Sequence, residues 1–328
     1  MSSFFSYSLI VFSNRISASV ILSFLFTSIK DNAIRRTTFR AVIDAALYNK
    51  LNSYKIGCDE METIHIPINA ERIISTSSKG DQSKWRIGNK WVKQNARGYE
   101  GQAEVLASLV LECSTLERSK YVVYQPCIIQ LADGEQYVGC YSLDFRGTKQ
   151  EVTLERLFEA NFSSTDSITS NKTLSTIEKF ELLMKQVEQY TGLIVNHQIA
   201  QLFAFDALIL NEDRHTNNIL FLYDPKEKTW ELAPIFDNGL SLLSDEKDYP
   251  ASKPLTILKR RVKAKPLNSS FTKQLSLYEG PAFIDKEKLV TAIENSQYDF
   301  GRAKDVLLSQ LRDPALKHLF IEGSESID

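Results

Sequence analysis

Residues 210–219, which read Leu-Asn-Glu-Asp-Arg-His-Thr-Asn-Asn-Ile, place a cluster of polar and charged side chains between two apolar segments. Residues 196–210 have apolar side chains at helical spacing, and residues 219–223 form the short apolar run that is typical of a strand. The sequence therefore predicts a loop between a helix and a strand. A solvated loop would hold only one or two such residues, and a loop stabilised by side-chain capping stays open as the alternative.

A second carboxylate, Asp237, follows the strands predicted over 219–223 and 230–235 and precedes Asn238-Gly239. In phosphoryl transfer, one carboxylate accepts the proton of the attacking hydroxyl, while a second carboxylate and an Asn amide oxygen hold magnesium against the phosphates. In protein kinases the first carboxylate and the Asn lie five positions apart on one loop, and the second carboxylate follows later. Asp213, Asn218 and Asp237 have this order and spacing; the alternative is a capped loop followed by an Asx turn.

Two upstream segments fit the same chemistry. Residues 75–84, Ser-Thr-Ser-Ser-Lys-Gly-Asp-Gln-Ser-Lys, offer hydroxyls and a glycine turn whose backbone N–H groups can contact phosphates. Lys93 ends a hairpin predicted over 85–93 with Gly88-Asn89 at its turn. In kinases such a lysine contacts the phosphates and a glutamate of the next helix. The helix predicted over 100–112 offers Glu104 as the better partner and Glu100 as the alternative. An ordinary solvated strand end is the other interpretation of Lys93.

Composition excludes several protein classes. The chain has 328 residues, 43% of them hydrophobic and 24% charged, and a net charge of −2. These values are typical of a globular protein and give no electrostatic pull toward nucleic acid. Cys58, Cys113, Cys127 and Cys140 form no C-x-x-C pair, so we expect no structural zinc site. We expect these cysteines to be free thiols in a reducing cytosol. We therefore expect a cytoplasmic protein without a direct nucleic-acid role.

The chain divides into a β-rich part with one helix and a helix-rich part with one hairpin, with a boundary near 145–160. We expect strands over 64–68, 121–130 and 136–143, a loop over 162–171, and helices over 174–190, 286–294 and 300–311. Residues 1–30 contain two apolar runs separated by Asn14-Arg15, and the second is shorter than the ~20 residues that a spanning helix needs. A strand or buried helix is the favoured interpretation of residues 1–30. Membrane contact or export, and a start codon placed too far upstream, are the alternatives.

With these motifs in this order, the sequence resembles the HipA-like serine/threonine kinases, and especially the smaller CtkA-like branch. Segments 77–84, 91–93, 211–218 and 236–239 carry the resemblance. It implies an α+β, two-lobed, protein-kinase-like fold related to protein and phosphoinositide kinases. The β-rich N-lobe would be 1–145 and the helical C-lobe 146–328.

The resemblance also implies the activity and the site. ATP and Mg²⁺ would be used, with Asp213 as catalytic base and Asn218 and Asp237 as metal ligands. Lys93 would contact phosphate, with Glu104 as its partner. A hinge near 139–145, including Tyr141, would hold adenine. The predicted nucleotide-binding set is Ser77, Ser78, Gly80, Gln82, Lys84, Lys93, Tyr141, Asn218 and Asp237.

Regulation and partners follow from the resemblance as further expectations. Ser77 and Ser78 are candidates for autophosphorylation, because a phosphate there would add negative charge where the ATP phosphates bind. The resemblance implies a protein as the substrate and a role as a toxin or a secreted effector. A DNA-binding antitoxin partner is an option, although the residues before 70 do not clearly match the subdomain of larger members.

Three questions remain open in the sequence. The same catalytic parts also suit a lipid or small-molecule kinase, or a nucleotide-binding effector without catalysis. His215 either supports the catalytic site beside Asp213 or is a core imidazole that shapes the loop. The basic run 259–265 is either a solvated face or a docking segment for an acidic substrate or nucleic acid.

Overall fold

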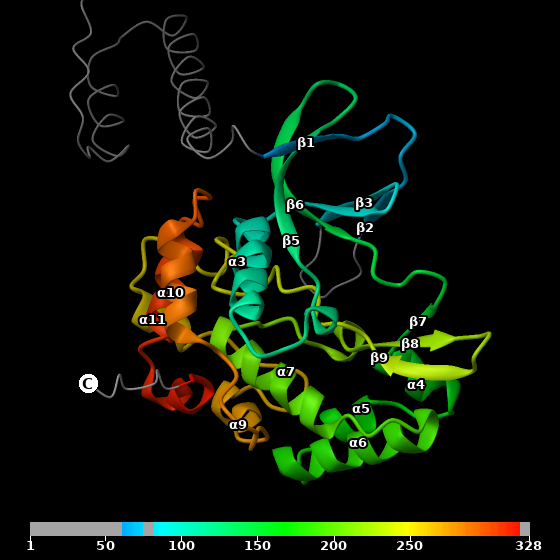
Figure 1. Ribbon diagram of the computed structural model, residues 1–328. Helices are drawn as coiled ribbons and strands as arrows, with labels where there is room; N and C mark the ends of the chain where they lie inside the picture. Colours follow the sequence, from blue (N-terminus) through cyan, green and yellow to red (C-terminus); the bar gives the residue numbers. More distant parts are fainter. Residues whose placement is uncertain (1–60, 75–81, 322–328) are drawn as a thin grey trace, which may run out of the picture. The chain divides into compact units, whose positions relative to one another are not determined.

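The computed structural model describes residues 61–74 and 82–321, and these described residues belong to one compact unit. Its elements are drawn in Figure 1. The expectations for residues 1–30, and those for Ser77, Ser78 and Gly80, lie outside the described residues. Among the described residues, no helix combines the length and the apolar character needed to cross a membrane.

A six-stranded sheet forms the first part of this unit, with the strand order β1-β5-β6-β4-β3-β2. All neighbours are antiparallel except β1 and β5, which run parallel. The strands are β1 Glu62–His65, β2 Arg72–Ile74, β3 Ser83–Ile87, β4 Lys90–Gln94, β5 Tyr124–Gln130 and β6 Gln136–Leu143. The predicted hairpin with Gly88-Asn89 at its turn is confirmed as β3–β4, where Gly88 has φ +60°.

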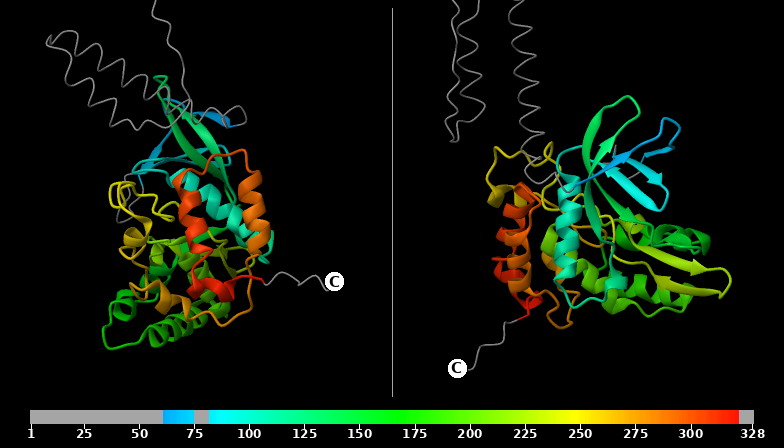
Figure 2. Two further views of the ribbon diagram at one scale, coloured as in Figure 1. Left: turned by 90° about the vertical axis from the view of Figure 1, so that its left-hand side faces the viewer. Right: turned by 45° about the horizontal axis from the view of Figure 1, so that its top comes forward.

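Helix α3 (Glu100–Glu112) coincides with its predicted bounds and connects the sheet to the helical part. It packs against β5 and β6 on one side and against α10 (Lys286–Asn295) and α11 (Arg302–Gln310) on the other. Figures 1 and 2 show α3 between the sheet and these two helices. Its apolar residues join the large core of the helical part, while a smaller core lies within the sheet. Helix α3 is thus fixed from both sides.

The second part is mostly helical and contains a three-stranded sheet in the order β7-β8-β9. These strands are β7 Gln150–Thr153, β8 Leu220–Asp224 and β9 Thr229–Leu232. The remaining helices are α4 Leu154–Ala160, α5 Asp166–Thr169, α6 Thr176–Thr191, α7 Asn196–Ile209, α8 Leu255–Lys259 and α9 Phe271–Leu275. Short 3₁₀ turns cover Arg118–Lys120, Thr216–Asn218 and Pro314–Leu319. The expected α+β architecture, with a β-rich first part and a helical second part, is confirmed.

Local sequence explains the ends of the two long helices. Ser175 and Glu178 form a capping box at the start of α6, and Gly192 ends the helix in the left-handed conformation with φ +74°. Helix α7 ends at Leu210, which adopts φ +55° without being a glycine. A leucine is held there only by its surroundings, and it turns the chain directly into the polar loop 211–218.

Three expectations were wrong in detail. The expected loop 162–171 contains α5, because Asp166–Thr169 closes one helical turn over the buried Ile168. The strand expected over 64–68 ends at His65 in β1, and Ile68 is exposed. Most of the expected hinge is strand, since β6 continues to Leu143, and the connection between the two parts is 144–149.

Candidate active site

The loop 211–218 is built by hydrogen bonds to the end of α7 and across itself. The Asn211 amide donates to the Asp206 carboxylate at 3.0 Å, and its own side-chain oxygen accepts the Asp213 N–H at 3.0 Å. Asn218 Nδ2 donates to the Asp213 carbonyl at 2.8 Å. This bond closes the loop between the two residues that the sequence places five apart. Because the amide nitrogen of Asn218 is used in this bond, its amide oxygen is the atom suited to ligate a cation.

Arg214 joins this loop to the segment that carries the second carboxylate. Its side chain is 1% exposed and pairs with Asp206, which is also buried, with Nε 3.0 Å from Oδ2. Its Nη1 donates to the carbonyls of Asn218 at 3.1 Å and Phe236 at 2.8 Å. Its Nη2 donates to Asn238 Oδ1 at 2.7 Å. One guanidinium therefore places Asn218 and the residues flanking Asp237 side by side, with its planar set of donors.

A buried ion cluster lies on the sheet side of Asp237. Lys93 Nζ is 2.5 Å from Glu104 Oε1 and 2.7 Å from Asp237 Oδ1, and it donates to the Tyr124 hydroxyl at 3.2 Å. Lys84 Nζ is 3.3 Å from Asp237 Oδ2. Glu104 also accepts the Asn238 N–H at 2.8 Å through its other oxygen. Residues from β3, β4, α3 and β5 thus meet the segment after β9 around Lys93 and Asp237.

The pKa directions follow from burial and from these ion pairs. Burial alone would raise the pKa of Asp237, but Lys84 and Lys93 hold it well below its ordinary value. Burial alone would lower the pKa of Lys93, but Asp237 and Glu104 raise it, so the lysine stays protonated. Burial raises the pKa of Glu104, against the opposing effect of Lys93. The contacts of the cluster therefore favour the charged forms of Lys93 and Asp237.

Asp213 lies next to two further cationic or titratable side chains. Its Oδ1 is 3.2 Å from Lys265 Nζ, and its Oδ2 is 3.7 Å from His215 Nε2. Burial lowers the pKa of His215 against the opposing effect of Asp213, and Lys265 has a smaller effect in the same direction as burial, so the neutral imidazole is favoured. Neither ring nitrogen of His215 has a hydrogen-bond partner within the part of the chain that the structure describes.

The structure brings most of the predicted site residues together. Lys84, Lys93 and Glu104 surround Asp237, and Arg214 links this group to Asn218 and the loop of Asp213. Of the two predicted glutamate partners, Glu104 contacts Lys93, whereas Glu100 accepts the N–H groups of residues 96–98.

Two predicted residues lie apart from these contacts. Tyr141 packs with the small core of the sheet, and its ring lies 4.4 Å from Lys90 Nζ. Its neighbour Cys140 faces the Val122 and Tyr124 side of the sheet, so Tyr141 points to the opposite face. Gln82 lies just before β3, and its amide nitrogen has no hydrogen-bond partner among the described residues.

Sequence reasoning missed Asp206, Tyr124, Asn238 and Lys265. Asp206 carried a signal, because it is a single carboxylate inside the otherwise apolar segment 202–210, and such a residue is rarely buried without a partner. Tyr124 and Asn238 had none beyond their positions near strand ends. Lys265 was one member of a basic run, and only the fold shows that it contacts Asp213.

The donor set suits a magnesium ion that arrives with a nucleotide. In residues 61–74 and 82–321, no group of three or more His, Cys, Asp or Glu side chains is arranged to hold a metal by itself. Asp237 and Asn218 offer a carboxylate and an amide oxygen, which are hard ligands, and Arg214 fixes their backbones beside each other. Two protein ligands plus substrate phosphates are the usual coordination of Mg²⁺ in such sites.

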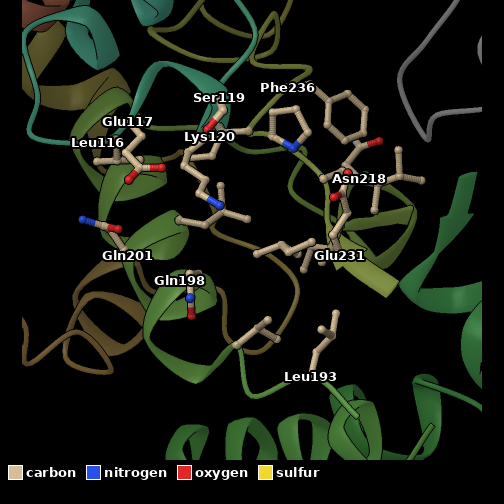
Figure 3. A pocket seen from close by; sticks show the side chains of 18 of the residues that line it. Leu116, Glu117, Ser119, Lys120, Leu193, Gln198, Gln201, Asn218, Glu231 and Phe236 are labelled. Atoms are coloured by element: carbon tan, nitrogen blue, oxygen red, sulfur yellow. The ribbon is translucent and has the colours of Figure 1, made fainter. Parts of the chain in front are cut away.

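A separate cavity of about 580 Å³ lies on another side of the loop (Figure 3). Its wall includes Asn218 and Phe236, but not Lys93, Asp213 or Asp237. Figure 3 shows Gln198 and Gln201 on α7 at the left, Glu117 and Lys120 above them, and Asn218 and Phe236 at the right. This cavity therefore touches the back of the loop and is not the place where the ion cluster lies.

Comparison with known proteins supports the fold. The chain is similar to the crystal structure of a proinflammatory kinase, CtkA, from Helicobacter pylori, with a TM-score of 0.50 and 16% sequence identity. The match covers 76% of this chain and 93% of that chain. No family model and no curated protein matches the chain. At this identity the likeness shows a shared architecture, and the chain has a kinase-like α+β fold with a β-rich first part and a helical second part.

Proposed function

We propose that this protein is a serine/threonine protein kinase that transfers the γ-phosphoryl group of ATP to a hydroxyl group. The proposal rests on one arrangement: Lys93 pairs with both Glu104 and Asp237, while Asn218 is closed onto Asp213. A cation, two oxygen ligands and a separate carboxylate are the groups that phosphoryl transfer uses. The kinase-like fold supports the same conclusion.

Each residue has a role that its position allows. Asp213 accepts the proton of the attacking hydroxyl, because its carboxylate is held by the hydrogen-bonded loop 211–218 and its side chain is 8% exposed. Lys93 contacts phosphate oxygens and is aligned by Glu104, which is fully buried. Asn218 and Asp237 would hold Mg²⁺, which neutralises charge on the phosphates when it is bound.

The free protein keeps this site assembled through ion pairs. Lys84 and Lys93 occupy both oxygens of Asp237, so the carboxylate stays ionised and in place. A bound nucleotide offers these ammonium groups phosphate oxygens as new partners, and Asp237 is then available to ligate a cation. Phosphate contacts of residues 75–81 remain part of the proposal, as does autophosphorylation at Ser77 or Ser78.

Transfer of labelled phosphate from ATP tests the proposal. The purified chain of residues 1–328, treated first with a phosphatase, is incubated with γ-³²P-ATP and Mg²⁺, alone and with dephosphorylated casein. We expect labelling of the chain, of casein or of both. Asp213→Asn should reduce the rate by about 10²–10⁴-fold, because the base is lost while the shape of the loop is kept.

Asp133→Asn is the matched control. Asp133 lies in the exposed turn between β5 and β6, where its Oδ1 accepts the Glu135 N–H at 3.0 Å. Asn keeps this acceptor, so the control should transfer phosphate like the wild type. Equal transfer by Asp213→Asn and the wild type would contradict the proposed base, and no transfer by the wild type to either acceptor would contradict the proposed activity.

A further inference from the structure

Lys265 reaches the candidate catalytic base from a distant part of the chain. Its Nζ lies 3.2 Å from Asp213 Oδ1, although the two residues are 52 positions apart. The Lys265 side chain is 36% exposed, whereas the Asp213 side chain is 8% exposed. Lys265 therefore lies at the open side of the carboxylate, where a substrate must approach.

A buried glutamine holds the backbone that carries Lys265. Gln274 is 0% exposed, and its Nε2 donates to the Lys265 carbonyl at 2.8 Å. Its Oε1 accepts the N–H groups of Leu267 at 2.8 Å and Asn268 at 3.3 Å. Ala264 and Leu267, on either side of Lys265, are buried. The lysine is thus presented by a supported segment, unlike a typical surface lysine.

The other basic residues of the run 259–265 are placed differently. Arg260, Arg261 and Lys263 are exposed, and Lys259 donates to Ser309 Oγ at 3.1 Å. Lys265 is the member of the run that pairs with Asp213. The run is therefore not one uniform face, and Lys263 is a natural control for its neighbour.

The charges around Asp213 suggest what Lys265 does. Lys84 and Lys93 lie at the far carboxylate, Asp237, whereas Lys265 lies beside Asp213. The transferring group carries negative charge past Asp213, which is itself an anion. A fixed cation on this side offsets that repulsion, and preorganised charges of this kind contribute strongly to phosphoryl transfer.

We propose that Lys265 is a catalytic residue that contacts the γ-phosphoryl group during transfer, an inference that rests on the proposed kinase activity. The acceptor oxygen forms a bond to the γ-phosphorus while the bond to the β–γ bridging oxygen breaks. The electron pair of that bond leaves with ADP, and the hydroxyl proton goes to Asp213. Lys265 stays protonated throughout and stabilises the charge on the phosphoryl oxygens.

Three variants test this role: Lys265→Met, Lys265→Arg and the control Lys263→Met. Transfer of γ-³²P is measured to two acceptors, dephosphorylated casein and water, so that effects on the acceptor can be separated from effects on the phosphoryl group. We expect Lys265→Met to lower kcat for both acceptors by a similar factor, about 10²–10³-fold, with the KM for ATP changed much less. Lys265→Arg should restore part of the rate, and Lys263→Met should match the wild type.

Two measurements separate this role from an effect through Asp213 or through folding. If Lys265 only kept Asp213 ionised, Lys265→Met would shift the acidic limb of the pH–rate profile and regain the wild-type rate at higher pH. We expect a low rate at every pH instead. Binding of ADP with Mg²⁺ should be unchanged in Lys265→Met, whereas the gain in affinity on adding aluminium fluoride, a mimic of the transferring group, should be lost.

The proposal is overturned if only transfer to casein falls, because Lys265 would then recognise the acceptor. It is also overturned if Lys263→Met loses as much activity, if the rate recovers at high pH, or if Lys265→Met keeps the wild-type kcat. A wild type that transfers phosphate to neither acceptor would contradict the proposed kinase activity itself, which is a different result. If Lys265→Met does not fold, Lys265→Arg is tested in its place. The proposal is overturned if Lys265→Arg folds like the wild type but gains no affinity for ADP and Mg²⁺ on adding aluminium fluoride.

Discussion

Arg214 allows a quantitative test of how the site is held together. The Arg214 and Asp206 side chains are each 1% exposed and form an ion pair inside the helical part. Arg214→Met removes the cation and leaves the Asp206 carboxylate buried without its counter-charge. Breaking a buried pair from one side costs about 3–5 kcal/mol in the free energy of unfolding. We expect a loss of this size.

The double variant Asp206→Leu/Arg214→Met separates the ion pair from the other contacts of Arg214. An apolar pair removes the uncompensated charge, and such replacements are often neutral or stabilising. The carbonyls of Asn218 and Phe236 still lose a donor, at about 1 kcal/mol each. The double variant should therefore be more stable than Arg214→Met, yet both variants should be inactive, because the loop and the Asp237 segment are no longer joined.

Equilibrium urea unfolding followed by circular dichroism measures these differences, and the γ-³²P assay measures the activity. The two single variants and the double variant form a double-mutant cycle. A loss below about 1 kcal/mol for Arg214→Met, or single effects that simply add in the double variant, would refute the reasoning. Full activity in the double variant would show that Arg214 does not position the site.

Three further predictions concern other parts of the fold. A Cβ at Gly139 would lie 2.2 Å from the Lys93 carbonyl oxygen, so Gly139→Ala should lower the free energy of unfolding in urea by about 1–3 kcal/mol. It should also lower the rate of phosphoryl transfer by displacing β4. Wild-type stability and a wild-type rate would contradict this prediction. Burial lowers the pKa of His215 below its ordinary 6.5, so the contribution of His215 to stability is complete above pH 6.5 and is lost as the pH falls. His215→Asn should remove this part of the pH dependence of Tm. A pH profile of Tm that is the same in His215→Asn and the wild type would contradict this prediction. The Arg146 side chain lowers the pKa of Asp144 to about 2, so Arg146→Met should raise that pKa toward its ordinary value in a carboxyl NMR titration, and a pKa that stays near 2 would contradict the ion pair.

Local patterns predicted the elements with strong signals. Residues 100–112 have good helix formers at helical spacing, and α3 has these bounds. Gly88-Asn89 predicted the β3–β4 turn. In contrast, β7 has the polar sequence Gln-Glu-Val-Thr and exists because it pairs with β8, which is distant in the chain. Such pairing leaves little trace in a short segment.

The site was predictable where its residues lie within one loop or one helix. Asp213 and Asn218 share a loop, and Glu104 comes eleven positions after Lys93. Lys265 and Asp213 are brought together only by tertiary structure, so the basic run gave no indication of which lysine contacts the base. Gly139 was assigned to a hinge, yet it is a strand residue whose missing Cβ lets β6 approach Lys93 closely.

The mass of the intact chain tests the central claim most directly. Phosphatase-treated wild type, Asp133→Asn and Asp237→Asn are incubated with ATP and Mg²⁺, with casein present as a second acceptor, and both proteins are weighed by mass spectrometry. The account predicts added phosphate in the reactions of the wild type and Asp133→Asn and none with Asp237→Asn. No added phosphate with the wild type, or equal amounts with Asp237→Asn, would contradict it.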